Sequence, residues 1–506
     1  MEEAILGIDV GTSSIKCSLF DLNGVELFSS SSDYDLLNPE PEIFEIDPEA
    51  IWEAVLNSIL KINQLNSSKH KIAAVGICAM MVMPVLLDAN NKVIRPIIHW
   101  FDGRLQKQYY KLKSGGKNRE IAVYSGSGLT GESTINAIDW VKNNEPENYS
   151  QINKFFMIKD FIRYKLTGKI LSDFGDASGS QMFDTREWIW SEEIISALGF
   201  NRSFFPELVK PTDIGGFITK EASQATGLAD GIPVAVGSGD GITTIFGLGI
   251  YKDGQVGITV GSAGVIGAST KQFPQDNKLR TYVLCHPFCD RWYSLMATSS
   301  SGEIFRWYCN SIVKNNQVSF ADLDKEAADS PPGSDGILFM PYLLGSRNPY
   351  SNPQASGMIL GLRYKHRRSH LTRAILEGIS LELLDIMRVQ DEILGNGKIK
   401  IGEVKISGGI TKSKFWMQLL ADVFQTDLIT TKVKELGTLG AAIIASTAVG
   451  KFKNLEEATK AMVANGETIK HNVSLKQLYD GKFQLFREMY KYLEPKFSSF
   501  IDKKFN

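Results

Sequence analysis

Short apolar runs rich in β-branched residues alternate with helix-periodic segments along the chain. Residues 4–10 (AILGIDV) and 15–20 (IKCSLF) flank a turn of glycine and hydroxyl residues, which predicts a β-hairpin. Residues 48–63 carry apolar side chains at helical spacing, which predicts a helix. Residues 71–77 and 81–87 are two more strand candidates. Because strands and helices keep alternating, the pattern predicts an α/β fold.

The second half of the chain repeats this beginning. GIDVGTSS at 7–14 returns as GITVGSAG at 257–264, an offset of 250 residues (257 − 7). The repeat is too long for a solenoid, so it indicates a duplicated domain that opens on the same hairpin. The glycine-rich region 237–249 is the best boundary, which predicts domains at 1–246 and 247–506. Helices are expected at 302–313, 367–394, 413–425 and 437–448.

Composition narrows the classes of protein that this chain can be. With 506 residues, more than one domain is expected. A net charge of −2 argues against a nonspecific nucleic-acid surface. The uncharged, largely apolar stretch at residues 72–87 is too short and too interrupted to span a membrane. The start of the chain lacks signal-peptide features, and five cysteines form no disulfide framework, so a cytoplasmic protein with reduced thiols is expected.

Two motifs that suggest a cofactor are weak. Cys285-His286-x-x-Cys289 has no second ligand pair, which argues against structural zinc. GSGLTG at 126–131 fits the dinucleotide-binding pattern, but no clear βαβ unit surrounds it.

The two hairpin turns suggest an anion site. Glycine lets a backbone approach phosphate closely, and hydroxyl groups add hydrogen bonds. Two such turns on two domains predict a cleft that grips one polyphosphate, although ordinary hairpins are the alternative. Asp9 ends the first strand, whereas its counterpart is Thr259. A carboxylate kept in one copy only, beside phosphates, is a candidate ligand for Mg²⁺, with a turn-forming aspartate as the alternative.

Three further stretches carry candidate chemistry, each with an ordinary turn or surface ion pair as its alternative. GSGDG at 237–241 places Asp240 on an exposed tip after a strand, where it can act as a base. Gly408 and Gly409 precede a helix and predict close approach to a nucleotide. HWFDGR at 99–104 places Asp102 and Arg104 on one side of an extended segment, suited to hydroxyls or a carboxylate.

These stretches together resemble the FGGY carbohydrate kinase family, which has the fold class of sugar kinases, actin and Hsp70. The motifs appear in family order from GIDVGTSSIK through WFDGR, GSGDG, GITVGSAG, SGEIFRW and SGGITKSKFWMQLLADVF to GTLGAA, and cover the chain to about residue 450. The resemblance implies two ribonuclease H-like domains with an interdomain active site, and ATP with Mg²⁺ as phosphate donor. It implies that Asp240 is the catalytic base and that Asp9 and Asp240 lie at the metal. It places Gly11, Thr12, Ser13, Ser14, Lys16, Gly261, Ser262, Gly302, Arg306, Gly408, Gly409 and Ser413 along the nucleotide.

The acceptor is a small sugar or sugar acid by the same resemblance, bound by Met81, Val82, Asp102, Arg104, Asp240 and Gly241. Xylulokinases carry Gln-Met-His-Gly where this chain has Met80 to Met83, and Gly241 matches gluconate kinases of the family. These differences favour D-gluconate, with D-xylulose as the alternative. A non-catalytic, actin- or Hsp70-like ATP-binding protein is a third hypothesis, against which the intact Asp240 argues. A homodimer is an open alternative to a monomer.

Overall fold

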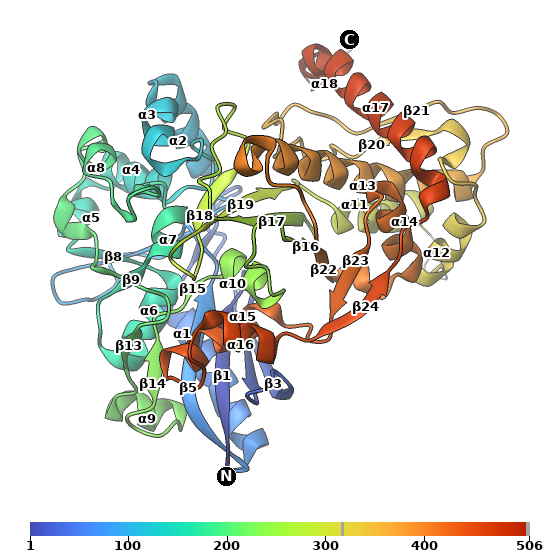
Figure 1. The fold of residues 1–506 in the computed structure, drawn as a ribbon. Coiled ribbons are helices and arrows are strands. Elements are labelled where there is room, and N and C mark those ends of the chain that lie inside the picture. Colours follow the sequence, from blue (N-terminus) through green and yellow to red (C-terminus); the bar gives the residue numbers. More distant parts are fainter. Residues whose placement is uncertain (315–317, 502–506) are drawn as a thin grey trace. The chain divides into compact units, whose positions relative to one another are not determined.

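The computed structural model describes residues 1–314 and 318–501 (Figure 1). Contacts divide them into two compact units. Unit 1 holds residues 1–251, 270–293 and 435–464, and unit 2 holds the described residues of 252–269, 294–434 and 465–501. The sequence placed a single boundary at 246/247, whereas the structure returns two later segments to unit 1. A local change in composition cannot reveal such a return, because long-range packing causes it.

The sheet of unit 1 is built on the first hairpin. β1 (Glu2–Val10) and β2 (Ser14–Phe20) are antiparallel, as the alternating pattern predicted. β5 (His70–Ala79) lies parallel to β1 on its other side, so β1 is paired along both edges, and its residues from Ala4 to Ile8 are buried. The strand order is β13-β14-β5-β1-β2-β3, with the short strand β15 (Ser238–Gly239) also beside β5. The remaining strands of this path are β3 (Glu26–Asp33), β13 (Ile214–Phe217) and β14 (Pro233–Ala235).

Helix α1 (Pro48–Asn66) confirms the helix that was expected at 48–63. The Asp47 side chain accepts the Glu49 N–H at 3.0 Å, and Pro48 occupies the first turn, where a missing N–H costs nothing. The predicted apolar stripe is buried in the core of unit 1. The helix ends at Ser67, which has a positive φ of 44°.

Helix α15 (Leu436–Ala448) packs onto this sheet through glycines. A Cβ on Gly7 would lie 2.1 Å from the carbonyl oxygen of Thr438, and a Cβ on Gly76 would lie 2.1 Å from that of Ala441. Gly440 approaches the Thr243 carbonyl in the same way, at 2.1 Å. Side chains at these positions would hold the helix away from β1 and β5. This close packing brings residues 435–464 into unit 1.

The other elements of unit 1 complete the layers around the sheet. Its shorter strands are β4 (Glu45–Ile46), β6 (Pro84–Leu87), β7 (Ile97–Ile98), β8 (Lys154–Met157), β9 (Ser172–Asp173), β10 (Phe183–Asp184), β11 (Ile189–Trp190), β12 (Leu208–Val209) and β18 (Tyr282–Cys285). Its helices include α2 (Gly103–Ser114), α3 (Lys117–Ser125), α4 (Thr134–Asn144), α5 (Pro146–Gln151), α6 (Ile158–Thr167), α7 (Phe174–Gly179), α8 (Glu192–Leu198), α9 (Lys220–Thr226), α10 (Asp240–Gly247) and α16 (Leu455–Met462), with a 3₁₀ turn at Arg202–Phe204.

Unit 2 repeats the arrangement of strands. β16 (Val256–Val260) and β17 (Gly264–Thr270) form the second predicted hairpin, and β22 (Val404–Gly408) lies parallel to β16 as β5 does to β1. The order is β19-β17-β16-β22-β23-β24. The duplicated sequence therefore builds the same three-strand core in each unit. The outer strands are β19 (Trp292–Ala297), β23 (Leu428–Thr431) and β24 (Asn465–Ile469), and β20 (Leu338–Met340) pairs with β21 (Met358–Leu360).

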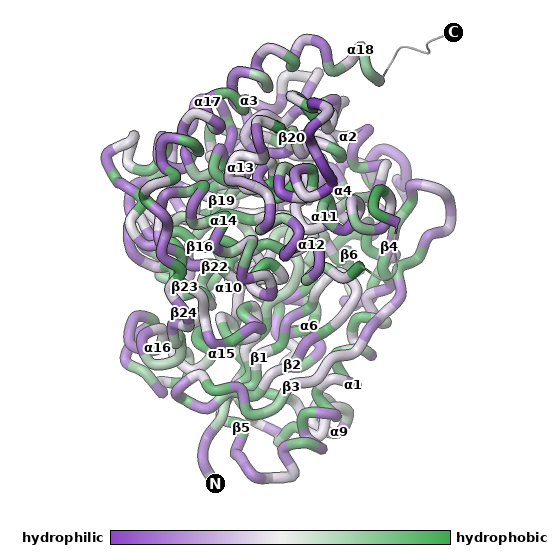
Figure 2. The backbone as a smooth tube through the Cα atoms, turned by 90° about the vertical axis from the view of Figure 1, so that its right-hand side faces the viewer, coloured by the Kyte–Doolittle hydropathy of each residue, from purple (hydrophilic) through white to green (hydrophobic). Residues whose placement is uncertain are grey.

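The helices of unit 2 bury a core of their own. α13 (Arg368–Ile393) and α14 (Lys414–Phe424) confirm the helices expected at 367–394 and 413–425. The helix expected at 302–313 is α only over α11 (Gly302–Trp307) and continues as a π-helix at Tyr308–Val313. In Figure 2 the inner strands are mainly hydrophobic and the outer loops mainly hydrophilic. The other helices are α12 (Phe320–Ala328), α17 (Lys476–Leu493) and α18 (Phe497–Ile501), with 3₁₀ turns at Ser334–Gly336, Leu394–Gly397, Gly409–Lys412, Val473–Leu475 and Glu494–Lys496.

Among the described residues, no helix combines the length and apolar character that crossing a membrane requires.

Candidate functional site

Asp9 and Asp240 lie at the same edge of the unit 1 sheet. Asp9 is opposite Cys78 on the neighbouring parallel strand β5, and Ser238 on β15 is opposite the same cysteine. Since the carboxyl ends of parallel strands meet at one edge, the end of β1 and the residue after β15 come together. Asp240 is the first residue of α10 and is half-buried, rather than on the exposed tip that was expected. The apolar residues Ile242, Ile245 and Phe246 bury the helix behind it.

Both carboxyl groups have raised pKa values. Burial raises the pKa of Asp9 to about 6, against the lowering effect of Cys78 and Lys16. Burial, and then the negative charge of Asp9, raise the pKa of Asp240 to about 7. The Gly241 N–H donates to Oδ1 of Asp240 at 2.7 Å, which only partly offsets this cost. The pair is therefore a site of unbalanced negative potential.

This acidic pair fits Mg²⁺. Oδ1 of Asp9 is buried and accepts no hydrogen bond from the described residues. The same part of the chain shows no cluster of three or more histidine, cysteine or acidic residues that could enclose a metal. Mg²⁺ is commonly held by one or two carboxylates together with water and substrate phosphates, and not by an all-protein cage. The carboxylate oxygens of Asp9 and Asp240 are suited to hold Mg²⁺ in this way.

The first turn, Gly11 to Ser14, presents small polar groups beside Asp9. The Gly11 N–H donates to the Ser14 carbonyl at 3.0 Å, while Thr12 and Ser13 are exposed. Tyr34 braces this turn: its hydroxyl donates to the Gly11 carbonyl at 2.5 Å, and its N–H donates to the Ser13 carbonyl at 3.2 Å. The negative charge of Asp240 helps, after burial, to raise the pKa of Tyr34. Sequence reasoning missed Tyr34, whose only local signal is its place after the serine-rich strand β3.

Lys16 lies next to this turn, in register with Asp9. Its exposed Nζ donates to Oε2 of Glu435 at 2.8 Å. Glu435 immediately precedes α15, so the return of that helix to unit 1 supplies the partner.

The second turn belongs to unit 2 and has a similar form. The Gly261 N–H donates to the Ala263 carbonyl at 2.9 Å, and Ser262 is exposed. The Gly302 N–H donates to the Gly261 carbonyl at 3.0 Å, and a Cβ on Gly302 would lie 2.4 Å from that oxygen. The structure therefore brings Gly302 directly onto the second turn, and only glycine fits there without a shift.

The other nucleotide candidates also lie in unit 2. Gly408 ends β22 with φ +97°, and a Cβ there would lie 2.5 Å from the Val260 carbonyl, whereas Gly409 has more room. The Ser413 hydroxyl accepts the Trp416 N–H at 2.9 Å, so it caps α14. Arg306 is exposed and pairs with Glu303 at 2.8 Å. Gly408 and Gly302 thus both lie against the second hairpin, while Ser413 and Arg306 have local partners.

Met81 and Val82 lie beside the segment that leads to Asp240. The strand expected at 81–87 begins only at Pro84, because Met81 and Val82 form a bend in which Val82 has φ +66°. That conformation is strained for a β-branched residue and is often found at functional sites. Met81 packs against the backbone of Gly239, where a Cβ would lie 2.3 Å from its Cγ. The acceptor candidates Met81 and Gly241 are therefore neighbours of Asp240 in unit 1.

Asp102 and Arg104 are not on an extended segment, which corrects the sequence expectation. Asp102 caps α2, and its buried carboxylate accepts the Arg104 N–H at 2.8 Å. The Arg104 guanidinium donates back to both oxygens of Asp102, at 2.9 and 2.8 Å, and to Oε1 of Glu45 at 2.8 Å. It lies 4.7 Å from the ring centroid of Trp140. The cap explains the pairing, because a helix start folds residue i + 2 back onto its capping side chain.

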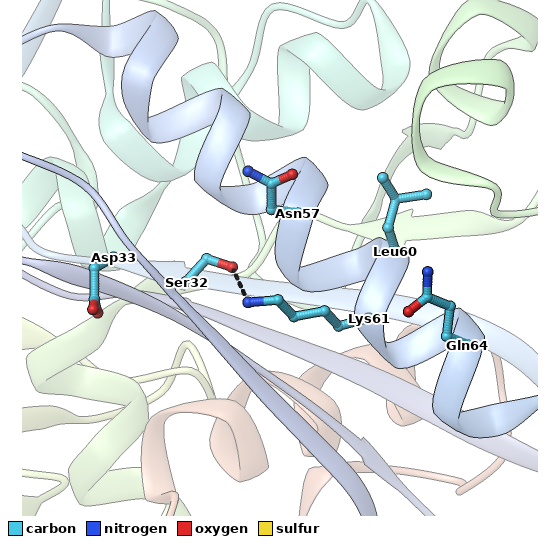
Figure 3. A pocket seen from close by; sticks show the side chains of 6 residues that line it. All are labelled: Ser32, Asp33, Asn57, Leu60, Lys61 and Gln64. Carbon is cyan, nitrogen blue, oxygen red and sulfur yellow. Dashed lines mark hydrogen bonds between the residues drawn. The ribbon is translucent and has the colours of Figure 1, made fainter.

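A polar hollow of about 570 Å³ lies elsewhere on unit 1, between β3 and α1. Figure 3 shows Lys61 reaching Ser32 there, with Nζ 3.1 Å from the serine Oγ. The hollow contains none of the candidate residues.

The two weak motifs lie in unit 1. GSGLTG begins at Gly126, which ends α3, so it does not follow a strand. Cys285 and Cys289 are free cysteines, and the Nε2 atom of His286 is 3.1 Å from the Ile250 carbonyl oxygen.

Both halves of the chain match one sequence family. Residues 4–247 match the N-terminal domain of the FGGY family of carbohydrate kinases, and residues 257–449 match its C-terminal domain. The chain belongs to this family. The kinase is 32% identical over 491 residues to the xylulose kinase of Lactococcus lactis, covering 96% of each chain. It is 28% identical over 480 residues to the gluconokinase of Bacillus subtilis, covering 93% of this chain and 92% of that one.

Solved structures show the same fold. The kinase matches the gluconate kinase of Lactobacillus acidophilus with a TM-score of 0.93 at 26% identity, covering 99% and 100% of the two chains. It matches the ligand-bound xylulose kinase of the same species with a TM-score of 0.92 at 26% identity, covering 98% and 100%. These matches confirm the two-domain sugar-kinase fold that the resemblance implied. The protein is a phosphotransferase that acts on an alcohol group of a carbohydrate.

Proposed function

We propose that this kinase transfers the γ-phosphoryl group of ATP to a terminal hydroxyl of a small sugar, with Asp240 as the general base. Sugar kinases of the family use ATP. The observation that carries the role of Asp240 is its environment: a half-buried carboxyl group, at the start of α10, with a pKa raised to about 7. A base with a pKa near the working pH accepts a proton most effectively.

In this reaction the sugar hydroxyl oxygen forms a bond to the γ-phosphorus, and the bond from that phosphorus to the bridging oxygen of ADP breaks. The hydroxyl proton passes to the Asp240 carboxylate. In unit 1, Thr12, Ser13 and the backbone of Gly11 are the candidates for contact with the phosphates, and in unit 2 the candidates are Gly261 and Ser262. Asp9, with Asp240 beside it, would hold Mg²⁺, which would neutralise charge on the phosphates.

For the acceptor we favour a neutral ketose, with D-xylulose ahead of D-gluconate. The sequence favoured gluconate and left xylulose open. Gluconate needs a free cation for its carboxylate, and Arg104 was the candidate. In unit 1, however, Arg104 and Arg95 share three carboxylates: Arg104 pairs with Asp102 and Glu45, and Arg95 with Glu45 and Glu145. Because the negative charges outnumber the positive ones, this cluster disfavours a further anion.

Asp240→Asn tests the proposed reaction. The variant keeps the size and hydrogen bonds of the side chain but cannot take the proton, so kcat should fall by about 10²–10⁴-fold. The nucleotide Kd, measured by titration calorimetry, should change far less, because Asp240 belongs to neither of the two turns that we propose as phosphate contacts. A variant with kcat within threefold of wild type would contradict the base assignment.

A panel of acceptors tests the substrate. We expect kcat/KM for D-xylulose to exceed that for D-gluconate by about tenfold, the factor that 1.4 kcal/mol of repulsion would produce. ADP release in the absence of any sugar is the control. Sugar-independent turnover at the same rate would instead favour an ATPase.

A further inference from the structure

Five charged side chains of unit 1 form a buried cluster that the proposed mechanism does not use. Lys159 and Arg163 of α6 lie with Asp160, Asp173 and Asp176, and none of these residues is more than 1% exposed. Nζ of Lys159 is 2.5 Å from Oδ1 of Asp160, 3.1 Å from Oδ1 of Asp173 and 3.7 Å from Oδ2 of Asp176. Burying so many charges is costly, and well-packed apolar residues often replace such clusters without loss of stability. Stability alone therefore does not account for this arrangement.

The cluster forms two hydrogen bonds with the segment that ends in Asp240. Nζ of Lys159 donates to the Val236 carbonyl at 3.2 Å. The Ser238 hydroxyl donates to Oδ2 of Asp173 at 2.7 Å. Asp173 itself is fixed, because it caps α7 and accepts the Gly175 N–H at 2.8 Å. The backbone two and four residues before Asp240 is thus tied to helices α6 and α7.

Apart from Ser238, the segment between Val236 and Asp240 consists of glycines, Gly237 and Gly239. Gly237 has φ +74°, and a Cβ there would lie 2.0 Å from the Ile77 carbonyl oxygen. A Cβ on Gly239 would lie 2.8 Å from Oδ1 of Asp176 as well as against Met81. Ser238 is therefore the one side chain between Val236 and Asp240 that reaches another element.

We propose that Asp173, held by Lys159, is a positioning residue that sets the place of Asp240 through its hydrogen bond with Ser238. This inference rests on the proposed role of Asp240 as the base. The base must keep hydrogen-bond distance to the sugar hydroxyl, and a misplacement of about 1 Å in such a geometry lowers the rate by about 10²-fold. The ionic cluster supplies a rigid support in which each partner is restrained by several others.

The test compares two buried serines of the same cluster. Ser238 and Ser172 are 0% and 2% exposed, and each donates one hydrogen bond to a cluster aspartate, Ser238 to Asp173 at 2.7 Å and Ser172 to Asp160 at 2.6 Å. Only Ser238 belongs to the segment leading to Asp240. Ser238→Ala should lower kcat by about 10–100-fold with KM for ATP within threefold of wild type. Ser172→Ala should lower the thermal midpoint about as much as Ser238→Ala does. It should nevertheless leave kcat within twofold of wild type.

Asp173→Asn is the second variant, because it keeps the shape of the cap while weakening the hold of Lys159. It should lower kcat as Ser238→Ala does. The double variant should lose no more kcat than the more impaired single variant, since both substitutions break the same hydrogen bond between Asp173 and Ser238. Equal kcat for Ser238→Ala and Ser172→Ala, or additive losses in the double variant, would overturn the inference. Asp240→Asn, assayed alongside, separates the two proposals. If Asp240→Asn is inactive while Ser238→Ala and Ser172→Ala have equal kcat, only the positioning role fails. If Asp240→Asn is active, the base assignment fails.

Discussion

The Nζ atom of Lys16 on β2 lies 2.8 Å from Oε2 of Glu435, the residue that precedes α15. Lys16 is also in register with Asp9, and Glu435 together with Asp9 raises its pKa despite partial burial. A lysine beside the turn at Gly11 to Ser14 is thus engaged by a carboxylate, which must compete with any phosphate that Lys16 binds.

Glu435→Gln should therefore strengthen nucleotide binding. An exposed ion pair contributes about 0.2–1 kcal/mol, so freeing Lys16 should lower the Kd for ATP by about 1.5–5-fold. Titration calorimetry at low and high salt measures this, and the gain should shrink at high ionic strength. Lys16→Gln should weaken binding, and an unchanged Kd in both variants would remove Lys16 from the phosphate site.

Asp240 should make the stability of unit 1 depend on pH. Its pKa of about 7 in the folded state lies above the ordinary 3.8, so the folded state holds the proton more tightly than the unfolded state. Stability from this group is present at low pH and is lost as pH rises from about 4 through about 7. Asp240→Asn has no carboxyl group to titrate, so it avoids this loss. The loss in the free energy of unfolding is at most about 1.4 kcal/mol for each pH unit between about pH 4 and pH 7.

Thermal midpoints from pH 4 to 8, without metal or nucleotide, measure this effect. The advantage of Asp240→Asn over wild type should grow up to pH 7 and stay constant above it. A pH-independent difference between the two proteins would show that Asp240 has an ordinary pKa. A variant that is less active but more stable would separate the base role from a structural one.

The glycines under α15 should be intolerant of the smallest side chain. A Cβ on Gly76 would lie 2.1 Å from the Ala441 carbonyl oxygen, which is backbone and cannot rotate away. Gly76→Ala should destabilise unit 1 by about 1–3 kcal/mol through overpacking. The thermal midpoint measures this.

Gly481 in α17 is the matched control. No atom lies within 4 Å of the position that its Cβ would take, and its φ is not positive. Gly481→Ala should stabilise that helix by about 0.5–1 kcal/mol, because glycine is a poor helix former. If both substitutions have the same effect, packing of α15 is not what Gly76 provides.

Local patterns were enough to predict the strands of the two hairpins. β1 and β2 lie within two residues of the strands expected at 4–10 and 15–20, and β16 and β17 form the hairpin expected around 257–264, because alternation and a glycine turn are short-range signals. The helix cap at Asp102 was within reach too, since aspartate is a preferred residue immediately before a helix. The extended assignment of 99–104 overlooked that signal.

Long-range partners could not be predicted from local patterns. Lys159 occurs in a segment, KDFIRYKLTG, that is typical of an exposed amphipathic helix, yet it is buried against Asp173 and the Val236 carbonyl. Glu45 meets Arg104 across 59 residues, and Glu435 meets Lys16 across 419. These contacts depend on how the strands and helices assemble, which the periodicity of one segment does not contain.

The charge around Arg104 should control selectivity between acidic and neutral acceptors. Two guanidinium groups, of Arg95 and Arg104, face the carboxylates of Glu45, Asp102 and Glu145. Glu45→Gln keeps the side-chain length and an oxygen acceptor but removes one negative charge, so the cluster becomes neutral. Repulsion of a sugar acid should then fall by about 0.5–1 kcal/mol, which raises kcat/KM for D-gluconate about 2–5-fold. The value for D-xylulose should change less than twofold.

Glu49→Gln is the matched control, because Glu49 is exposed in the nearby helix α1 and pairs with Lys165 at 2.8 Å. It removes the same charge without touching Arg104, so both sugars should be phosphorylated as by wild type. Raising the salt concentration should reduce the gain of Glu45→Gln with gluconate, since the effect is electrostatic and partly screened. If Glu45→Gln changes both sugars by the same factor, the Arg104 cluster supports the fold of the acceptor side without selecting the acceptor. The preference for a neutral ketose would then have to come from the bend at Met81 and Val82.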